Sequence, residues 1–264
     1  MIDRRAIGIF DSGVGGLTVL KEVEKVLPRE ELIYFGDNLR APYGSKSTEE
    51  ILEFTLNIGD FFIEKNVKML IIACNTATAV ALEALKDRLN IPVIGVIAPG
   101  SISAINLTKK NKIGVFSTPV TAKMNAYKNE IEKINKDIEV YQIGCKPLCK
   151  MIESEWEDTK ENQDIIKYYV EKLPTEIDVV VFGCTHYPII KEYFYRELKG
   201  KQFVNPAKET ALEAEKLLKK LKLLNKRESK GPVSFYTSGN VNKFKKIAEK
   251  ILGKPIKKIK QALN

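Results

Sequence analysis

The sequence predicts an α/β fold made of two similar halves with mainly parallel sheets. Short apolar runs alternate with segments that carry apolar residues at helical spacing, which is the pattern of parallel sheets flanked by helices. A weak internal repeat supports two halves, because IGIFDS (7–12) resembles IGVFST (113–118) and LIIACNT (70–76) resembles VVFGCTH (180–186). In each half, the second of these strands ends in a cysteine. We therefore expect the halves to be related by pseudo-symmetry.

The first half reads as alternating strands and helices. AIGIF (6–10) is apolar throughout, as in a strand buried on both faces. Ser47 and Glu50 have the spacing of a capping box at the start of a helix. The expected elements are a strand at 6–10, a helix marked by Leu17, Leu20, Val23 and Leu27, a strand at 31–36, a helix marked by Ile51, Phe54, Ile58 and Phe62, a strand at 69–74, a helix from Thr76 to Leu89 and a strand at 92–96.

The second half begins a new series of the same kind. Asn205 and Pro206 suit the N-cap and first turn of a long helix that we expect to run through Leu224. The C-terminal strand and helix can return to the first half, so we expect domains of residues 1–97 plus 208–264 and of residues 98–207. The other expected elements are strands at 112–118, 138–145, 178–184 and 233–239, a helix marked by Met124, Tyr127, Ile131 and Ile134, and a final helix from Val241 to Leu252.

The charge of the chain is unevenly distributed. The formal net charge of +9 first suggests nucleic-acid binding. Residues 207–264, however, contain 16 Lys and Arg against 5 Asp and Glu, whereas residues 1–206 contain 27 against 29. Lysines that solvate the C-terminal helices explain this excess, so nucleic-acid binding is not favoured.

The sequence favours the cytoplasm and gives no sign of a membrane segment. MLIIAC (69–74) is among the longest apolar runs and is far too short to cross a bilayer. The N-terminus lacks the pattern of a signal peptide, so we expect the four cysteines to be reduced. Cys145 and Cys149 lack the usual zinc spacing, and no second close Cys or His pair completes a site, so no metal is expected.

A glycine-rich turn, DSGVGG (11–16), follows the first strand. It contains neither a dinucleotide fingerprint nor a Walker lysine, so a nucleotide site is not favoured. Two interpretations stay open: the backbone N–H groups hold a small carboxylate ligand, or the strand-to-helix turn simply requires glycine. Asp11 lies where open α/β sheets bind ligands, although it can also serve only as a helix cap.

Two cysteine motifs end strands in the two halves. In ACNTAT (73–78), Cys74 precedes side chains that can bind a carboxylate or cap a helix, and a buried inert thiol is the alternative. In GCTHYP (183–188), Cys184 is followed by Thr185 and by His186, the single histidine of the chain. Three chemically active side chains in succession favour a functional site.

The two motifs together predict more than either one alone. A lone Cys–His pair suits acyl transfer, whereas two opposed thiols in a cleft between the halves suit the removal of a proton from one face of a carbon and its return to the other. Each thiol then needs a group that adjusts its proton affinity, since free cysteine is mostly protonated at neutral pH. Asp11 is the candidate for Cys74 and His186 for Cys184. A Cys–His hydrolase and a non-catalytic amino-acid-binding protein remain as rivals.

The motifs resemble those of the glutamate racemases, which are cofactor-independent enzymes of the aspartate/glutamate racemase superfamily. The matching segments are FDSGVGGLTV (10–19), GDNLRAPYG (36–44), ACNTAT (73–78), IGVFST (113–118) and GCTHYP (183–188). They occur in the order of the family, and the resemblance covers nearly the whole chain.

The resemblance implies roles for individual residues. Cys74 and Cys184 resemble the two acid/base thiols, assisted by Asp11 and His186, and Glu153 lies where the family carries a further acid, although CKPLCKMIE (145–153) departs from the usual run. The residues that resemble substrate contacts are Asp11, Ser12, Pro42, Tyr43, Gly44, Asn75, Thr76, Thr118, Thr121, Thr185 and His186.

The resemblance also implies the biological setting. The expected substrate is L- or D-glutamate, racemised without pyridoxal phosphate or metal to supply D-glutamate for peptidoglycan. A homodimer in the bacterial cytoplasm is the expected form.

Overall fold

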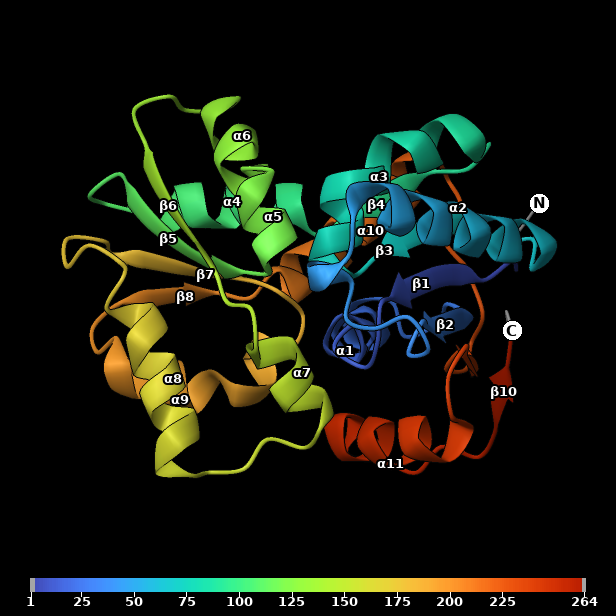
Figure 1. Cartoon of the computed structure of the whole chain (residues 1–264). Helices are drawn as coiled ribbons and strands as arrows, with labels where there is room; N and C mark the ends of the chain where they lie inside the picture. Colours follow the sequence, from blue (N-terminus) through green and yellow to red (C-terminus); the bar gives the residue numbers. More distant parts are fainter. Residues whose placement is uncertain (1–2, 263–264) are drawn as a thin grey trace.

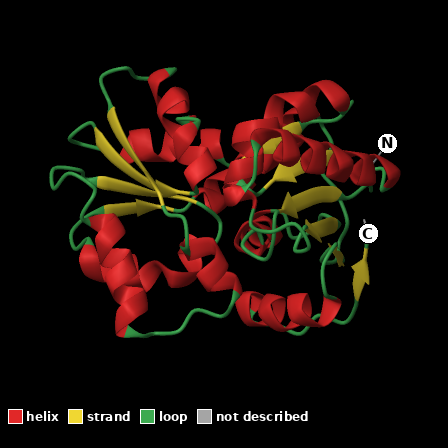
Figure 2. Ribbon diagram, viewed as in Figure 1, coloured by secondary structure: helices red, strands yellow, loops and turns green. Residues whose placement is uncertain are grey.

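The computed structural model describes residues 3–262 and contains two sheets with helices around them (Figure 1). One sheet has six strands in the order β10-β9-β2-β1-β3-β4, and the other has four in the order β6-β5-β7-β8. All strand pairs are parallel. The strands form two separate groups in Figure 2. The α/β class with mainly parallel sheets is therefore confirmed.

The six-stranded sheet draws on both ends of the chain. Its strands are β1 (Ile7–Asp11), β2 (Leu32–Gly36), β3 (Met69–Ile72), β4 (Val93–Gly95), β9 (Val233–Thr237) and β10 (Ile259–Gln261). The helical elements that accompany it are α1 (Leu17–Val26), the 3-10 turn η1 (Tyr43–Ser45), α2 (Thr48–Glu64), α3 (Asn75–Arg88), α10 (Pro206–Lys220) and α11 (Val241–Leu252).

The four-stranded sheet comes from one continuous segment. Its strands are β5 (Lys112–Ser117), β6 (Glu139–Gly144), β7 (Val179–Gly183) and β8 (Gln202–Val204). The helical elements here are α4 (Ile97–Leu107), α5 (Pro119–Lys123), α6 (Ala126–Glu132), α7 (Leu148–Glu153), α8 (Lys160–Val170), the 3-10 turn η2 (Tyr187–Ile190) and α9 (Lys191–Glu197).

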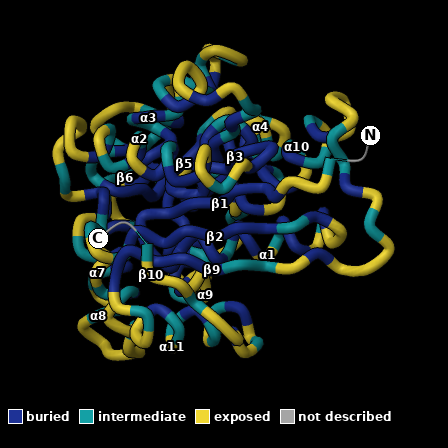
Figure 3. Tube along the Cα trace, turned by 90° about the vertical axis from the view of Figure 1, so that its right-hand side faces the viewer, coloured by how far each residue is buried: buried dark blue, intermediate teal, exposed yellow. Residues whose placement is uncertain are grey.

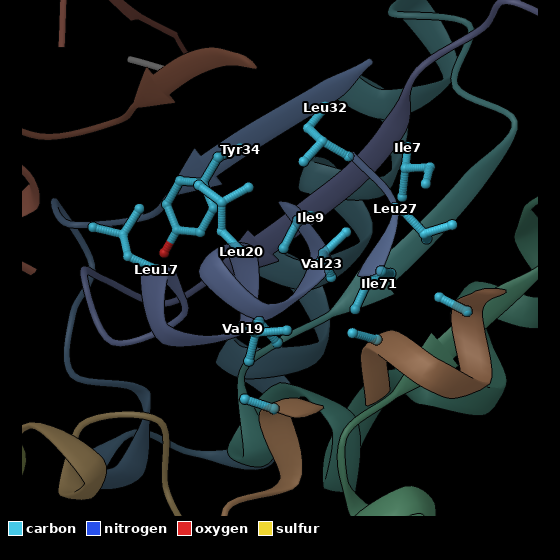
Figure 4. Close-up of a cluster of buried hydrophobic side chains, with 14 of the residues drawn as sticks. Ile7, Ile9, Leu17, Val19, Leu20, Val23, Leu27, Leu32, Tyr34 and Ile71 are labelled. Atoms are coloured by element: carbon cyan, nitrogen blue, oxygen red, sulfur yellow. The ribbon is translucent and has the colours of Figure 1, made fainter. Parts of the chain in front are cut away.

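The core lies between strands that are buried on both faces and the apolar sides of the helices. Every residue of β1, β2, β3 and β7 is buried, and Figure 3 shows β1 and β2 as dark blue strands in the middle of the molecule. Figure 4 shows Leu17, Leu20 and Val23 of α1 packed against side chains from the sheet. The helical spacing in the sequence predicted this apolar face of α1.

Two predicted helix starts are confirmed. Ser47 Oγ accepts a hydrogen bond from Glu50 N, and the Glu50 carboxylate accepts one from Ser47 N, which completes the capping box of α2. Asn205 caps α10 by accepting from Ala207 N, with Pro206 in the first turn. Helix α10 ends at Lys220, four residues before the predicted end at Leu224. Within residues 3–262, no helix combines the length and apolar character needed to span a bilayer.

The parallel strands determine where a site can form. The carboxyl ends of parallel strands lie at one edge of a sheet, where α/β proteins bind ligands. The strands of both sheets run toward the middle of the molecule (Figure 2). The loops that follow β1, β3, β5 and β7 therefore meet between the two sheets.

A buried ion pair fixes the opposite edge of the six-stranded sheet. Lys68 Nζ lies 2.6 Å from Glu30 Oε2 and donates to the Leu223 carbonyl oxygen at 2.7 Å, and both charged side chains are almost fully buried. Replacing Lys68 by alanine leaves the Glu30 carboxylate unpaired in the interior, so we expect a loss of about 3–5 kcal/mol in the free energy of unfolding.

Urea denaturation measures this effect. The matched control is Lys86→Ala, which removes an exposed pair with Glu83 and is expected to change stability by no more than about 0.5 kcal/mol. Equal urea midpoints for the two variants would contradict the structural role of Lys68.

Candidate active site

A small cavity lies between the two sheets at the carboxyl ends of their strands. Its volume is about 10 Å³, roughly the space of one water molecule. All but one of its lining residues are residues that the sequence singled out. The lining residues are Ser12, Pro42, Tyr43, Gly44, Cys74, Asn75, Thr76, Thr118, Cys149, Cys184, Thr185 and His186.

Cys74 reaches the cavity from the six-stranded sheet. It follows β3 and caps α3, where its sulfur accepts a hydrogen bond from Ala77 N at 3.5 Å. Its thiol donates to Ser12 Oγ at 3.6 Å. Burial raises the pKa of Cys74 to about 12, and the nearby charge of Asp11 adds to the effect. Without substrate in the cavity, Cys74 is therefore a neutral thiol.

Cys184 reaches the cavity from the four-stranded sheet. It follows β7, and its sulfur lies 3.6 Å from His186 Nδ1. The other ring nitrogen, His186 Nε2, lies 2.9 Å from Glu153 Oε1 at the end of α7. Burial acts to lower the pKa of His186, but interactions with Cys149 and Glu153 outweigh it and place the pKa well above its ordinary value. Thiol, imidazole and carboxylate thus form a continuous chain.

Cys149 is the lining residue that sequence reasoning missed. It lies in the first turn of α7, with its sulfur 3.3 Å from the sulfur of Cys184. The hydrogen bond between the two sulfurs lowers the pKa of Cys149 in spite of its burial, and His186 acts in the same direction. Burial, together with this hydrogen bond, raises the pKa of Cys184. The two buried sulfurs therefore compete for protons, and their titrations are coupled.

A sequence signal for Cys149 does exist. Cys149 and Glu153 are four residues apart, so on a helix they lie on one face, and both interact with His186. The signal requires knowing that residues 148–153 form a helix and that this helix lies beside the end of β7.

Asp11 connects the two halves without contacting Cys74 directly. It lies behind the lining residues of the cavity, and its carboxylate accepts hydrogen bonds from Gly13 N and, from the second half, Thr185 Oγ1, each at 3.1 Å. Burial raises the pKa of Asp11, while His186 and the N–H groups of the glycine-rich turn act in the opposite direction. Its influence on Cys74 is therefore that of a nearby charge.

The glycine-rich turn allows the second half to approach closely. A Cβ on Gly13 would lie 1.9 Å from Glu153 Oε1, and a Cβ on Gly15 would lie 2.4 Å from Thr185 Oγ1. Any side chain at either position would displace Glu153 or Thr185. The turn requires glycine because of contacts from elsewhere in the chain, a reason that neither interpretation of the sequence included.

Three threonine hydroxyls form a second connection across the cavity. Thr76 Oγ1 lies 2.9 Å from Thr118 Oγ1 and 3.3 Å from Thr121 Oγ1, and the latter two are 3.0 Å apart. Thr121 does not line the cavity, but its hydroxyl contacts the hydroxyls of Thr76 and Thr118, which do. Each hydroxyl can donate or accept, so the cluster can turn hydrogen-bond donors toward a bound anion.

Two tyrosines hold other parts of the wall. The Tyr127 hydroxyl donates to Asn75 Oδ1 at 2.7 Å, which leaves the Asn75 amide N–H groups for other partners. Tyr43 donates to the buried Asp37 carboxylate, which also accepts from Ser238 Oγ at 2.6 Å. The helical spacing indicated only that Tyr127 lies on the apolar face of a helix, because its contact with Asn75 joins elements that are distant in the chain.

Apart from the imidazole of His186, the lining offers neutral hydrogen-bond donors to a ligand. Among the lining residues there is no lysine or arginine. The N-terminal turn of α3, with Asn75 and Thr76, borders the cavity instead and presents free backbone N–H groups together with the positive end of the helix dipole. Such a site suits a small anion with carboxylate groups.

One group of lining residues has donor atoms suited to a metal. The sulfurs of Cys149 and Cys184 and a ring nitrogen of His186 all lie within 4.8 Å of one another. A structural zinc site has four ligands, and this group provides three. The absence of a metal from the reaction stays a prediction.

Comparisons with known proteins agree on one family. The Asp/Glu/Hydantoin racemase family matches residues 7–214. A glutamate racemase of Bacillus cereus is 41% identical, and the match covers 97% of this chain and 96% of that protein.

Solved structures of glutamate racemases have the same fold as this chain. The enzyme of Bacillus anthracis superposes with a TM-score of 0.94 at 38% identity, covering 99% of this chain and 98% of its own. The enzyme of Francisella tularensis, solved in complex with D-glutamate, superposes with a TM-score of 0.92 at 36% identity, covering 100% and 98%. The chain therefore belongs to the Asp/Glu/hydantoin racemase family and, within it, to the glutamate racemases.

Proposed function

We propose that this chain interconverts L-glutamate and D-glutamate by moving protons between Cα and two thiols, those of Cys74 and Cys184. One observation carries the proposal: two buried thiols from strand ends of different sheets line one cavity. A carbon held between opposed thiols loses a proton from one face and gains one on the other, which inverts its configuration. The scheme uses no cofactor.

The polar groups of the cavity support glutamate as the substrate. The hydroxyls of Thr76, Thr118 and Thr185 and the N-terminus of α3 offer donors to its carboxylates. The Asp11 carboxylate is the negative group that the substrate ammonium can approach. The bound D-glutamate of the Francisella tularensis relative is consistent with this choice of ligand.

The substrate itself provides the charge that starts the reaction. Cys74 can act as a base only when ionised, and its raised pKa opposes this. The ammonium of glutamate is an opposite charge close to the sulfur and lowers the thiol pKa. Cys184, whose pKa is raised by burial and by its contact with Cys149, then supplies a proton to the other face. In the reverse direction the two thiols exchange roles, so their titrations are coupled.

The carbanion formed at Cα is the high-energy intermediate of the proposed reaction. Without a cofactor to delocalise its charge, the site stabilises it with preorganised dipoles: the N–H groups at the start of α3 and the Asn75 amide, which Tyr127 orients. Holding Cα between the two sulfurs lowers the activation barrier further, because the reacting groups are already in position. Exclusion of water strengthens each of these interactions.

We also propose that the cavity opens by separation of two domains, residues 1–97 plus 208–264 and residues 98–207. A volume of about 10 Å³ is far too small for glutamate. Strand membership supports the division, because β9 and β10 join the first sheet whereas β5 to β8 form the second. Helices α4 and α10, which begin near the two crossings of the chain, contact each other and are suited to act as a hinge. Opening breaks the Thr185–Asp11 and Thr76–Thr118 hydrogen bonds.

The proposed role is supply of D-glutamate for peptidoglycan in the bacterial cytoplasm. We propose a homodimer on the basis of the family resemblance, and light scattering on the purified chain tests it.

Circular dichroism of amino-acid solutions tests the proposed reaction. We expect the purified protein to drive L-glutamate and D-glutamate each to zero optical signal, without pyridoxal phosphate and with EDTA present. In D2O the product should carry deuterium at Cα, because thiol protons exchange with solvent. Aspartate serves as the comparison substrate. Binding of glutamate without inversion, or activity lost in EDTA, would contradict the proposal.

The Glu153–His186 contact predicts a change in pH dependence. The carboxylate raises the pKa of His186, so Glu153→Gln lowers it and the imidazole loses its proton at lower pH. We expect the limb of the kcat profile governed by His186 to move to lower pH, and kcat at the optimum to fall by roughly tenfold.

Glu155→Gln is the matched control for Glu153→Gln. Glu155 lies two residues further along the chain and pairs at the surface with Lys246 at 2.6 Å. Its pH profile should coincide with that of the unmodified protein. Identical profiles for both variants would show that Glu153 does not act through His186.

A further inference from the structure

The proposed reaction leaves one cavity thiol without a role. Cys149 lines the same cavity as Cys74 and Cys184, is 5% exposed, and has its sulfur 3.3 Å from the sulfur of Cys184. This distance is that of two sulfurs in direct contact. The fourth cysteine, Cys145, is buried away from the cavity, with its thiol directed to the Ile143 carbonyl oxygen.

The position of Cys149 allows its sulfur to move. A disulfide requires an S–S distance of about 2.05 Å, so the two sulfurs would need to approach by little more than about 1 Å. Cys149 lies on α7, a six-residue helix, and residues 154–159 lead from it as non-helical chain. A small shift of α7 therefore leaves both sheets in place.

The two sulfurs also differ in reactivity. The hydrogen bond from Cys184 and the neighbouring His186 keep the pKa of Cys149 below its ordinary value, whereas burial raises the pKa of Cys74 and of Cys145. Oxidants attack the thiolate form. Of the four thiols, Cys149 is thus the preferred target, and Cys184 is the thiol next to it.

We propose that Cys149 and Cys184 form a reversible oxidation site, in which a peroxide converts the two thiols to a disulfide. The Cys149 thiolate attacks one peroxide oxygen, the O–O bond breaks, and Cys149 becomes a sulfenic acid while hydroxide leaves and takes a proton to form water. The Cys184 sulfur then attacks the Cys149 sulfur, and the departing hydroxide takes the Cys184 proton. Two thiols are oxidised by two electrons, and one peroxide is reduced to two waters.

The consequence for the reaction rests on the proposed function. A Cys184 sulfur held in a disulfide carries no proton, so the oxidised enzyme cannot racemise glutamate. The disulfide also protects Cys184 from irreversible oxidation, and a dithiol reductant restores it. Glutamate, which enters the same cavity, is expected to slow the oxidation.

The test uses the full-length protein, reduced and then exposed to hydrogen peroxide in a buffer with EDTA. We expect the count of free thiols in denaturant to fall from four to two, and proteolytic mapping to find Cys149 linked to Cys184. Dithiothreitol should restore all four thiols and the activity together. The thiol count and the peptide map are independent of activity, so failure of the proposed function and failure of this inference are distinguishable.

Two variants sharpen the result. Cys145→Ala should behave as the unmodified protein does, falling from three thiols to one. In Cys149→Val no linked peptide can form, and loss of Cys184 thiol should be at least about tenfold slower and irreversible by dithiothreitol. Absence of the Cys149–Cys184 peptide from the oxidised unmodified protein, or a dominant linkage through Cys74 or Cys145, would overturn the proposal.

Discussion

Cys74→Ala and Cys184→Ala are each expected to abolish racemisation, with kcat lowered by about 10³-fold or more. Either substitution removes one of the two sulfurs that we propose exchange a proton with Cα, so one of the two proton transfers loses its donor or acceptor. Because the two thiols act as a unit, the double variant should be little worse than either single variant. The measurement is the change in circular dichroism from each glutamate enantiomer.

Cys145→Ala provides the matched control for both thiol variants. Cys145 is also a buried cysteine, but it lies outside the cavity. We expect its kcat to stay within about twofold of the unmodified value, which excludes a general effect of removing a buried thiol. Racemisation at full rate by either cavity variant would contradict the two-thiol scheme.

Asp11→Asn is the second large expected effect, a fall of roughly 10²-fold or more in kcat with the fold retained. Asparagine has nearly the shape of aspartate, and its amide oxygen can still accept from Gly13 N or Thr185 Oγ1. What is lost is the negative charge that we propose attracts the substrate ammonium.

The direction in which the pKa of Cys74 changes in Asp11→Asn distinguishes an electrostatic role of Asp11 from a structural one. The charge of Asp11 raises the pKa of Cys74, so Asp11→Asn should make Cys74 ionise at lower pH even as racemisation becomes slower. Thiolate absorbance in the ultraviolet, followed as a function of pH in a Cys149→Val background, measures this. A pKa of Cys74 that stays constant or rises would contradict the proposed electrostatic coupling.

Asp178→Asn is the matched control for Asp11→Asn. Asp178 precedes β7 at the amino end of the sheet and likewise accepts from a threonine hydroxyl and a backbone N–H, those of Thr108 and Lys109, each at 2.6 Å. Because it lies at the edge of the sheet opposite the cavity, we expect activity to be unchanged.

The sheet strands could be predicted because burial on both faces leaves a plain record in the sequence. Strands such as β1 and β7 are continuous apolar runs that end in a polar or glycine-rich turn. Helix α4 was missed for a physical reason. Its first turn contains Pro99 and Gly100, which disfavour a helix on propensity. Proline is tolerated there because first-turn N–H groups need no partner, and Gly100 admits Pro206, 2.8 Å from where its Cβ would lie.

For the candidate site too, some residues could be predicted from the sequence and others could not. Residues that stand at strand ends within recognisable motifs, such as Cys74 and Cys184, could be predicted from the chain alone. Cys149 and Tyr127 could not be predicted in this way. Their roles come from contacts with Cys184 and Asn75, which are distant in the sequence and become neighbours only in the folded chain. The sequence around a residue shows whether it stands at the end of a strand, but it does not show which distant residues the side chain contacts.

The solitary imidazole gives the protein a built-in spectroscopic probe. Because the chain has one histidine and it lies between Cys184 and Glu153, every histidine ring resonance in a magnetic-resonance spectrum comes from the candidate active site. Selective isotope labelling of that one residue reports tautomer, protonation and ligand arrival without any assignment step. The same signal distinguishes an open from a closed cavity in solution, in the unmodified protein and during turnover.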